Sequence, residues 1–188
     1  MNKPKIALLI DLASLRVSCE GFKKLAEEIG AKYDIVSVKF YSYVAKRNRD
    51  FNEYIAAKGY DAVTPIASRR RNKLDTRQII DATLIGMSST IDAVAFAVGD
   101  GDILPIVSYL KLKGMDVLDI DVVESPYIEA FSGFIPVKES YLREGYAAPA
   151  MKKPAPKKAP KKVVEPEVRQ ENPYVSDVKS ILARYKRG

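Results

Sequence analysis

The sequence predicts an α/β fold, a three-layer α/β/α sandwich whose mainly parallel sheet has five or six strands. Short apolar runs alternate with amphipathic helical segments throughout residues 5–122. The first run, KIALLI at residues 5–10, is continuously apolar, as expected of a strand buried on both faces. At 188 residues and 47% hydrophobic content, the chain can bury a sizeable core.

The strands are predicted from short runs of apolar, β-branched and aromatic residues. The second run, DIVSVKFYSY, is the clearest example of β-branched and aromatic enrichment. The predicted strands are residues 5–10, 34–43, 60–66, 93–98 and 115–122. A segment with helical spacing follows each of the first four strands, which favours parallel strands joined by crossover helices.

The helices are predicted from apolar residues at helical spacing. They are residues 15–29, 51–58, 76–87 and 104–113. Gly30, Gly59 and Gly114 are expected to end the first, second and fourth helices.

The composition changes after Tyr146, so residues 1–146 are expected to form the globular domain. Residues 147–173 are rich in Lys, Pro and Ala and predict a flexible linker. Residues 174–188 predict a short amphipathic helix that needs a partner surface, either on its own domain, a second copy or another protein. Its apolar residues at helical spacing are Val175, Val178, Ile181, Leu182 and Tyr185.

Residue content excludes several kinds of chemistry. The chain has no histidine, so His-based triads and HExxH zinc sites are impossible. Cys19 is the only cysteine, which excludes an internal disulfide and a cysteine-rich zinc site. No apolar run approaches the roughly 20 residues of a membrane span, and the N-terminus does not resemble a signal peptide. We therefore expect a cytoplasmic protein whose chemistry depends on carboxylates, hydroxyls, lysine or arginine.

Acidic residues follow two of the predicted strands. Asp11 follows KIALLI, and Asp100 and Asp102 follow AVAFAV, with Gly99 easing the turn. In an open parallel sheet, ligands bind beyond the carboxyl ends of the strands. If the first and fourth strands are neighbours, these three carboxylates lie at one edge, where a divalent cation such as Mg²⁺ or Mn²⁺ would relieve their repulsion.

A further acidic pair lies in NKLDTRQIIDA. Asp75 occupies a helix N-cap position, and Asp81 follows six residues later within the helix. Both can point toward the same edge only if Asp75 precedes the first helical turn. Asp75 can equally be only a helix cap, and Asp81 only a solvated surface residue.

Three motifs resemble the NYN domains, PIN-like nucleases that include the bacterial LabA-like branch. They are LLIDLASL, with Asp11; KLDTRQIIDA, with Lys73, Asp75 and Asp81; and VGDGDILPIVSYLKLKG, with Asp100 and Asp102. The resemblance implies a PIN-like sandwich that cleaves RNA with Mg²⁺ or Mn²⁺. We expect the substrates to be single strands and the cuts to be internal. It implies catalytic roles for Asp11, Asp75, Asp81, Asp100 and Asp102, and metal ligation by Asp11, Asp81, Asp100 and Asp102.

Two positions depart from the family pattern. Ser14 stands where the family has Asn, so a supporting interaction near the metal is altered, and Ile103 replaces a Phe. Lys73 and Gly99 are the other expected supporting residues. The Ser14 departure keeps a second hypothesis open: a catalytically weak or inactive RNA-binding or scaffolding protein with the same fold.

Basic residues lie beside the acidic motifs and predict contacts with RNA phosphates. They are Arg69, Arg70, Arg71, Lys73 and Arg77, with Lys46 and Arg47 extending the path. A solvated basic loop is the alternative interpretation. Tyr41 and Tyr43 could stack on bases, although tyrosines at alternating strand positions are more often core residues.

The net charge of +7 lies entirely in the tail. Residues 147–188 contain eleven Lys and Arg against four acidic residues, which leaves residues 1–146 with no net charge. A basic tail on a neutral domain predicts nonspecific, salt-sensitive nucleic-acid binding.

Overall fold

The computed structural model describes residues 2–65, 74–98 and 101–145. These residues form a six-stranded sheet in the order β3-β2-β1-β4-β5-β6, and every strand pair is parallel. The predicted linker and C-terminal helix, residues 147–173 and 174–188, lie outside the described residues.

The strands have the bounds β1 Lys5–Asp11, β2 Asp34–Tyr41, β3 Asp61–Ala62, β4 Ala93–Ala97, β5 Asp116–Asp121 and β6 Gly133–Pro136. The helices are α1 Cys19–Lys32, α2 Arg49–Lys58, α3 Thr76–Met87 and α4 Leu104–Leu112. Short 3₁₀ turns occur at η1 Gly101–Ile103, η2 Ile128–Ala130 and η3 Glu139–Tyr141.

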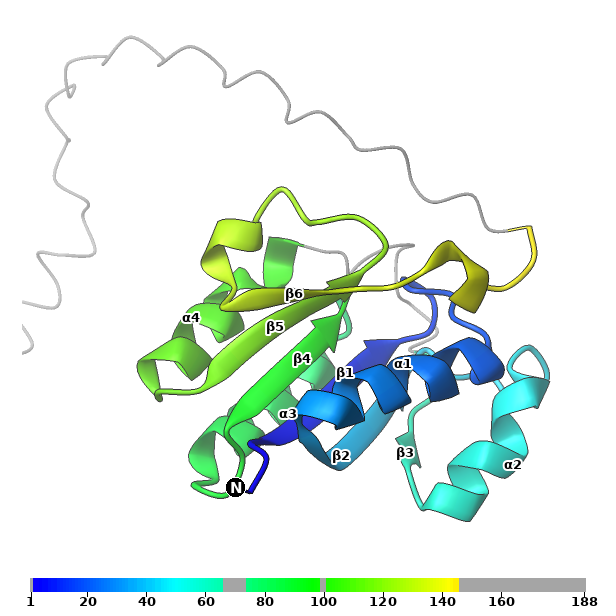
Figure 1. Ribbon diagram of the computed structural model, residues 1–188, viewed down its shortest axis with the longest axis horizontal. Coiled ribbons are helices and arrows are strands. Elements are labelled where there is room, and N and C mark those ends of the chain that lie inside the picture. The colour runs from blue at the N-terminus through cyan, green and yellow to red at the C-terminus, as the bar shows by residue number, and fades with distance from the viewer. Residues whose placement is uncertain (1, 66–73, 99–100, 146–188) are drawn as a thin grey trace, which may run out of the picture. The chain divides into compact units, whose positions relative to one another are not determined.

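Helices cover both faces of the sheet, which confirms the three-layer α/β/α prediction (Figure 1). One hydrophobic cluster joins alternate residues of β1, such as Leu8 and Ile10, to Phe22 of α1 and Phe51 of α2. A second joins Leu9 of the same strand to the residues of α3 and α4. Residues 6–11 are therefore buried on both sides, as the continuous apolar run predicts.

The first and fourth strands are neighbours at the centre of the sheet. Ile6 pairs with Ala93, and the register continues to Ile10 opposite Ala97. The segments that follow β1 and β4 therefore leave the same edge of the sheet. On the other side, β1 pairs with β2 up to Asp11 opposite Tyr41.

Three sequence-based element boundaries were wrong. The first helix begins at Cys19 rather than residue 15, because Ser18 accepts the Gly21 amide at 3.0 Å as its N-cap. Gly30 does not end this helix, which continues to Lys32. The third strand has only two residues rather than seven, since it lies at the sheet edge and Pro65 cannot donate to a ladder.

The sixth strand was not assigned from the sequence. Gly133–Pro136 is short, half-buried for most of its length, and contains both a glycine and a proline. These residues carry a weak strand signal, and pairing with β5 is what makes them a strand.

Candidate active site at the carboxyl edge of the sheet

Asp11 ends the central strand β1 as a fully buried carboxylate. Its Oδ1 accepts a hydrogen bond from the Ala13 amide at 2.9 Å, and its backbone carbonyl accepts from the amides of Ser14 and Leu15. The tight turn after the strand therefore holds the carboxylate in place. Its place at the carboxyl end of the central strand, where ligands of an open parallel sheet bind, makes Asp11 a candidate for binding a cation.

The segment after β4 reaches the same edge. Asp102 is exposed in the turn η1, directly before α4. Asp100 and Gly99 lie outside the described residues. Because β4 pairs with β1 as far as Ala97, Asp11 and the turn containing Asp102 lie beyond the carboxyl ends of adjacent strands.

Asp75 is the N-cap of α3 and is almost completely buried. Its Oδ1 accepts the Arg77 amide at 3.1 Å and the Arg77 Nε at 2.9 Å, and its Oδ2 accepts Arg77 Nη2 at 2.5 Å. Both carboxylate oxygens thus have a partner on Arg77. Asp75 precedes the first helical turn, which is the condition under which both acids of this motif can face the sheet edge.

Two residues of β2 hold the side chain of Asp81, which belongs to α3. Its Oδ2 accepts a hydrogen bond from the Tyr41 hydroxyl at 2.6 Å and lies 2.8 Å from Lys39 Nζ. Tyr41 is opposite Asp11 in the strand register, so Asp81 lies above the strand next to Asp11. Burial, together with the hydrogen bond to Asp81, raises the pKa of Tyr41 well above its usual range, so this phenol stays a donor.

Two further acids lie on β5, beside β4, and were not singled out from the sequence. Asp119 pairs in register with Phe96 and is only 5% exposed, and among the described residues its Oδ2 has no hydrogen-bond partner. Burial and then the charge of Asp121 raise the pKa of Asp119 to about 6. Burial also raises the pKa of Asp121. The available signal was the pair of acids at alternating positions in VLDID, a run otherwise typical of a buried strand.

The proposed RNA-binding residues are only partly described. Arg69, Arg70, Arg71 and Lys73 lie outside the described residues. Lys46 and Arg47 are exposed in the segment that follows β2. The guanidinium of Arg77 is occupied by Asp75 and by the Thr64 carbonyl, which accepts Nη2 at 2.6 Å.

The two tyrosines considered for base stacking are not exposed platforms. Tyr41 is fully buried and belongs to the hydrophobic cluster that contains α3 and α4 residues. Tyr43 is half-buried and its hydroxyl donates to Asn52 Oδ1. The core interpretation is correct for Tyr41.

The carboxylates near this edge fit Mg²⁺ or Mn²⁺ by their chemistry, because both ions prefer hard oxygen ligands. Within residues 2–65, 74–98 and 101–145, no group of three or more Cys, Asp or Glu side chains is close enough to hold a metal ion. The predicted ligand set includes Asp100, which falls outside these ranges. The metal site therefore stays a prediction.

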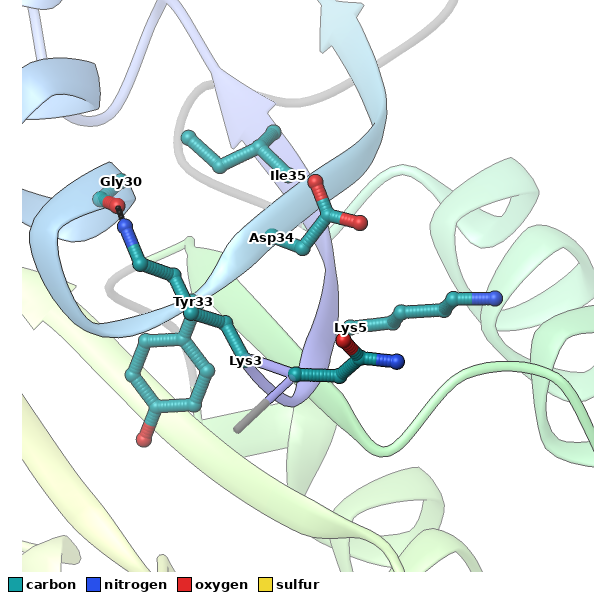
Figure 2. Close-up of a pocket in the computed structure, with 7 residues that line it drawn as sticks. Lys3, Lys5, Gly30, Tyr33, Asp34 and Ile35 are labelled. Carbon is teal, nitrogen blue, oxygen red and sulfur yellow. Dashed lines mark hydrogen bonds between the residues drawn. The ribbon is translucent and has the colours of Figure 1, made fainter.

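A hollow of about 460 Å³ lies at the opposite edge of the sheet, where β1 and β2 begin (Figure 2). Its lining residues are Asn2, Lys3, Lys5, Gly30, Tyr33, Asp34 and Ile35. Lys3 Nζ donates to the Gly30 carbonyl at 2.6 Å, and the Lys5 side chain points in a different direction. Its polar groups do not converge on one point, so we place the candidate active site at the carboxyl edge.

An α/β/α sandwich with acids beyond the carboxyl ends of its central strands is the arrangement of PIN-like nucleases. The chain matches the NYN domain over residues 5–138 and belongs to this family. The match includes all three acidic motifs, and it supports a function in nucleic-acid cleavage. The LabA-like assignment within the family stays a prediction.

The chain is similar to proteins of known structure. A protein of unknown function from Vibrio parahaemolyticus is similar with a TM-score of 0.60 at 20% identity, covering 76% of this chain and 98% of that one. At this identity the likeness shows the fold alone. An oxidoreductase from Thermotoga maritima has a TM-score of 0.33 at 15% identity, covering 69% of this chain and 32% of that one. This similarity is too low to indicate a shared fold or function.

No curated protein matches the sequence. Across the described residues, no helix is long and apolar enough to cross a bilayer.

Proposed function

We propose that the protein is a divalent-metal-dependent ribonuclease that hydrolyses phosphodiester bonds of single-stranded RNA. The observation that carries this proposal is the fully buried carboxylate of Asp11, at the end of a strand adjacent to the one that leads into the GDGD motif. The match to the NYN domain, which includes this strand, supports the proposal.

In this proposal, Asp11, Asp81, Asp100 and Asp102 hold Mg²⁺ or Mn²⁺. A bound ion would supply an activated water and stabilise charge on the phosphate oxygens. Lys39 and Tyr41 fix Asp81 through its Oδ2, and among the described residues no partner bonds to its Oδ1. Asp81 is therefore better suited than Asp75 to bind a cation.

Asp75 acts in this scheme through α3. Its carboxylate caps the helix and pairs with Arg77, so it fixes the position from which Asp81 extends. The basic residues 69–71, with Lys46, Arg47 and Lys73, would draw the RNA phosphates toward the acids.

Cleavage of an end-labelled single-stranded RNA tests the proposal. We expect products with Mg²⁺ or Mn²⁺, none with EDTA, and at least about a 100-fold lower rate for Asp11→Asn and Asp100→Asn, since each removes a charged ligand. Asp116→Asn is the matched control, because Asp116 is exposed at the start of β5 and thus at the opposite edge. Chelator-resistant cleavage, or full activity of Asp11→Asn, would contradict the assignment.

The second candidate is an RNA-binding protein that does not cleave, and Ser14 is the observation that favours it. Its amide helps to form the turn that holds Asp11, but no side-chain hydrogen bond of Ser14 to another described residue is found. A family Asn at this position would offer an amide group that serine lacks. Binding of RNA without cleavage in Mg²⁺ or Mn²⁺ would establish this alternative.

A further inference from the structure

Tyr127 is the most exposed aromatic side chain among the described residues, at 49%, and it lies beside the candidate active site. Its ring rests against Gly101, the residue between Asp100 and Asp102. A methyl group on Gly101 would lie only 2.9 Å from Tyr127 Cε2 and 3.1 Å from its Cζ. The glycine of the GDGD motif therefore leaves the space that the ring occupies.

The segment that carries Tyr127 is fixed by hydrogen bonds. The Tyr127 amide donates to Ser125 Oγ at 3.2 Å, and the Ile128 amide donates to the Ser125 carbonyl at 3.0 Å. Ser125 and Tyr127 line one small cavity together with the buried Asp119 of β5. These contacts fix the ring against Gly101. A ring that is already fixed loses less entropy when a ligand packs on it.

The surroundings of the ring are acidic. Glu124 and Glu129 are exposed on either side of Tyr127 in the chain, and Asp102 is exposed in the neighbouring turn. A phosphate would be repelled by these charges, whereas the uncharged face of a nucleobase would not. An aromatic ring can stack on any of the four bases.

We propose that Tyr127 stacks on an unpaired base of the RNA, next to the nucleotide whose phosphate would bind the metal ion held by Asp102. This inference rests on the proposed function and adds to it a structural reason for single-strand selectivity, because a paired base cannot offer its face to the ring. Tyr127 is thus a substrate-positioning residue rather than one that takes part in the hydrolysis.

The absence of tryptophan makes the contact measurable. In Tyr127→Trp the introduced indole is the only one, and stacking on a base should quench its fluorescence. An oligouridine of about 12 nucleotides, within the site sizes usual for single strands, is titrated in EDTA to prevent cleavage. Leu112→Trp is the matched control, since Leu112 is 87% exposed at the end of α4, opposite the site.

We expect saturable quenching in Tyr127→Trp with the single strand, little with the same oligomer paired to its complement, and none in Leu112→Trp. Anisotropy of labelled oligouridine should show Tyr127→Ala binding about 5- to 100-fold more weakly than wild type and Tyr127→Phe nearly unchanged. The thermal midpoints of both variants should match wild type, because the ring is half exposed.

The outcomes separate this inference from the proposed function. Binding by anisotropy without quenching, equal quenching in both tryptophan variants, or equal quenching by the duplex would overturn the stacking and leave the nuclease proposal standing. If wild type binds oligouridine neither in EDTA nor with Mg²⁺ present, both the RNA-directed function and the stacking are wrong.

Discussion

At the scale of single residues, Asp75 and Asp81 differ in how their carboxylate oxygens are bonded, and therefore in how well each can bind a cation. Asp75 is bound on both oxygens by Arg77, while Asp81 is held through Oδ2 alone by residues of β2. One motif therefore contains a structural acid and a candidate ligand, and the spacing in the sequence does not distinguish them.

This difference predicts opposite effects of two substitutions. Asp81→Asn should lower the cleavage rate by about 100-fold or more and leave the free energy of unfolding nearly unchanged, because the amide still accepts from Tyr41. Asp75→Ala should lower the free energy of unfolding by about 1–3 kcal/mol, since it removes the cap and the partner of Arg77. Urea unfolding and RNA cleavage measure the two effects, and a stable but inactive Asp75→Ala would reverse the assignment.

Asp119 predicts a pH dependence of stability. Its pKa rises from 3.8 to about 6 on folding, so between these values the native state binds a proton that the unfolded chain has released. The free energy of unfolding should therefore fall as pH rises through this window, by on the order of 3 kcal/mol for this group.

Urea unfolding from pH 4 to 8 measures this dependence, with Asp119→Asn as the comparison. The variant cannot ionise at this position, so its decline over the same window should be shallower, and what remains should come in part from Asp121, whose pKa is also raised. Parallel curves for the two proteins would show that Asp119 does not titrate in this range.

At the scale of elements, α1 contains two glycines in different environments. A Cβ on Gly21 would lie 2.0 Å from the Tyr141 carbonyl oxygen, where α1 packs against η3. A Cβ on Gly30 would meet no heavy atom within 4 Å. The same substitution should therefore have opposite signs within one helix.

Gly30→Ala should raise the free energy of unfolding by about 0.5–1 kcal/mol, the usual gain from alanine over glycine in a helix. Gly21→Ala should lower it by about 1–3 kcal/mol, because the backbone of α1 or η3 must shift. Thermal or urea unfolding of the two variants beside wild type gives the comparison. Stabilisation by Gly21→Ala would show that α1 does not pack closely on Tyr141.

Most elements follow from local patterns, and the exceptions have physical causes. The predicted and observed third helices coincide, since Asp75 caps the helix and residues 76–87 have helical spacing. The start of α1 was misjudged because Leu15 and Val17 are buried in the turn after β1, which extends the apolar pattern beyond the helix. The sixth strand depends on pairing with β5, which no local pattern encodes.

The sequence predicts which strand ends bring the acids of the candidate site together, but not the contacts that hold their side chains. The order of strands places Asp11 beside the end of β4, as expected from the parallel arrangement. The pairing of the Arg77 guanidinium with Asp75 depends on side-chain conformation. The contacts of Asp81 with Lys39 and Tyr41, and the packing of Tyr127 against Gly101, join residues that are distant in the sequence. Spacing alone carries no information about such contacts.

At the scale of the whole molecule, the net positive charge is concentrated in the C-terminal part of the sequence. The net charge of +7 lies in residues 147–188, while the remainder is neutral. We expect this tail to strengthen RNA binding without determining where the strand is cut, because phosphate contacts position nucleic acid without reading its sequence.

Replacing Lys152, Lys153, Lys157, Lys158, Lys161 and Lys162 by alanine should weaken RNA binding and reduce its salt dependence. The slope of log K against log salt should fall by up to about 0.7 for each lysine that contacts a phosphate. Alanine at Lys32, Lys58 and Lys113 is the control, since these exposed residues follow or end helices at the opposite edge of the sheet. An unchanged slope in the tail variant would exclude the tail from RNA binding.

Binding of Mn²⁺, followed by electron paramagnetic resonance, tests the central claim most directly, because it asks whether acids from separate strands share one ion. We predict that wild type and Asp116→Asn bind Mn²⁺ alike, while Asp11→Asn and Asp102→Asn each bind it at least about tenfold more weakly. If Asp11→Asn retains the affinity of wild type, the carboxylate at the end of β1 is not a ligand and the proposed active site is wrong.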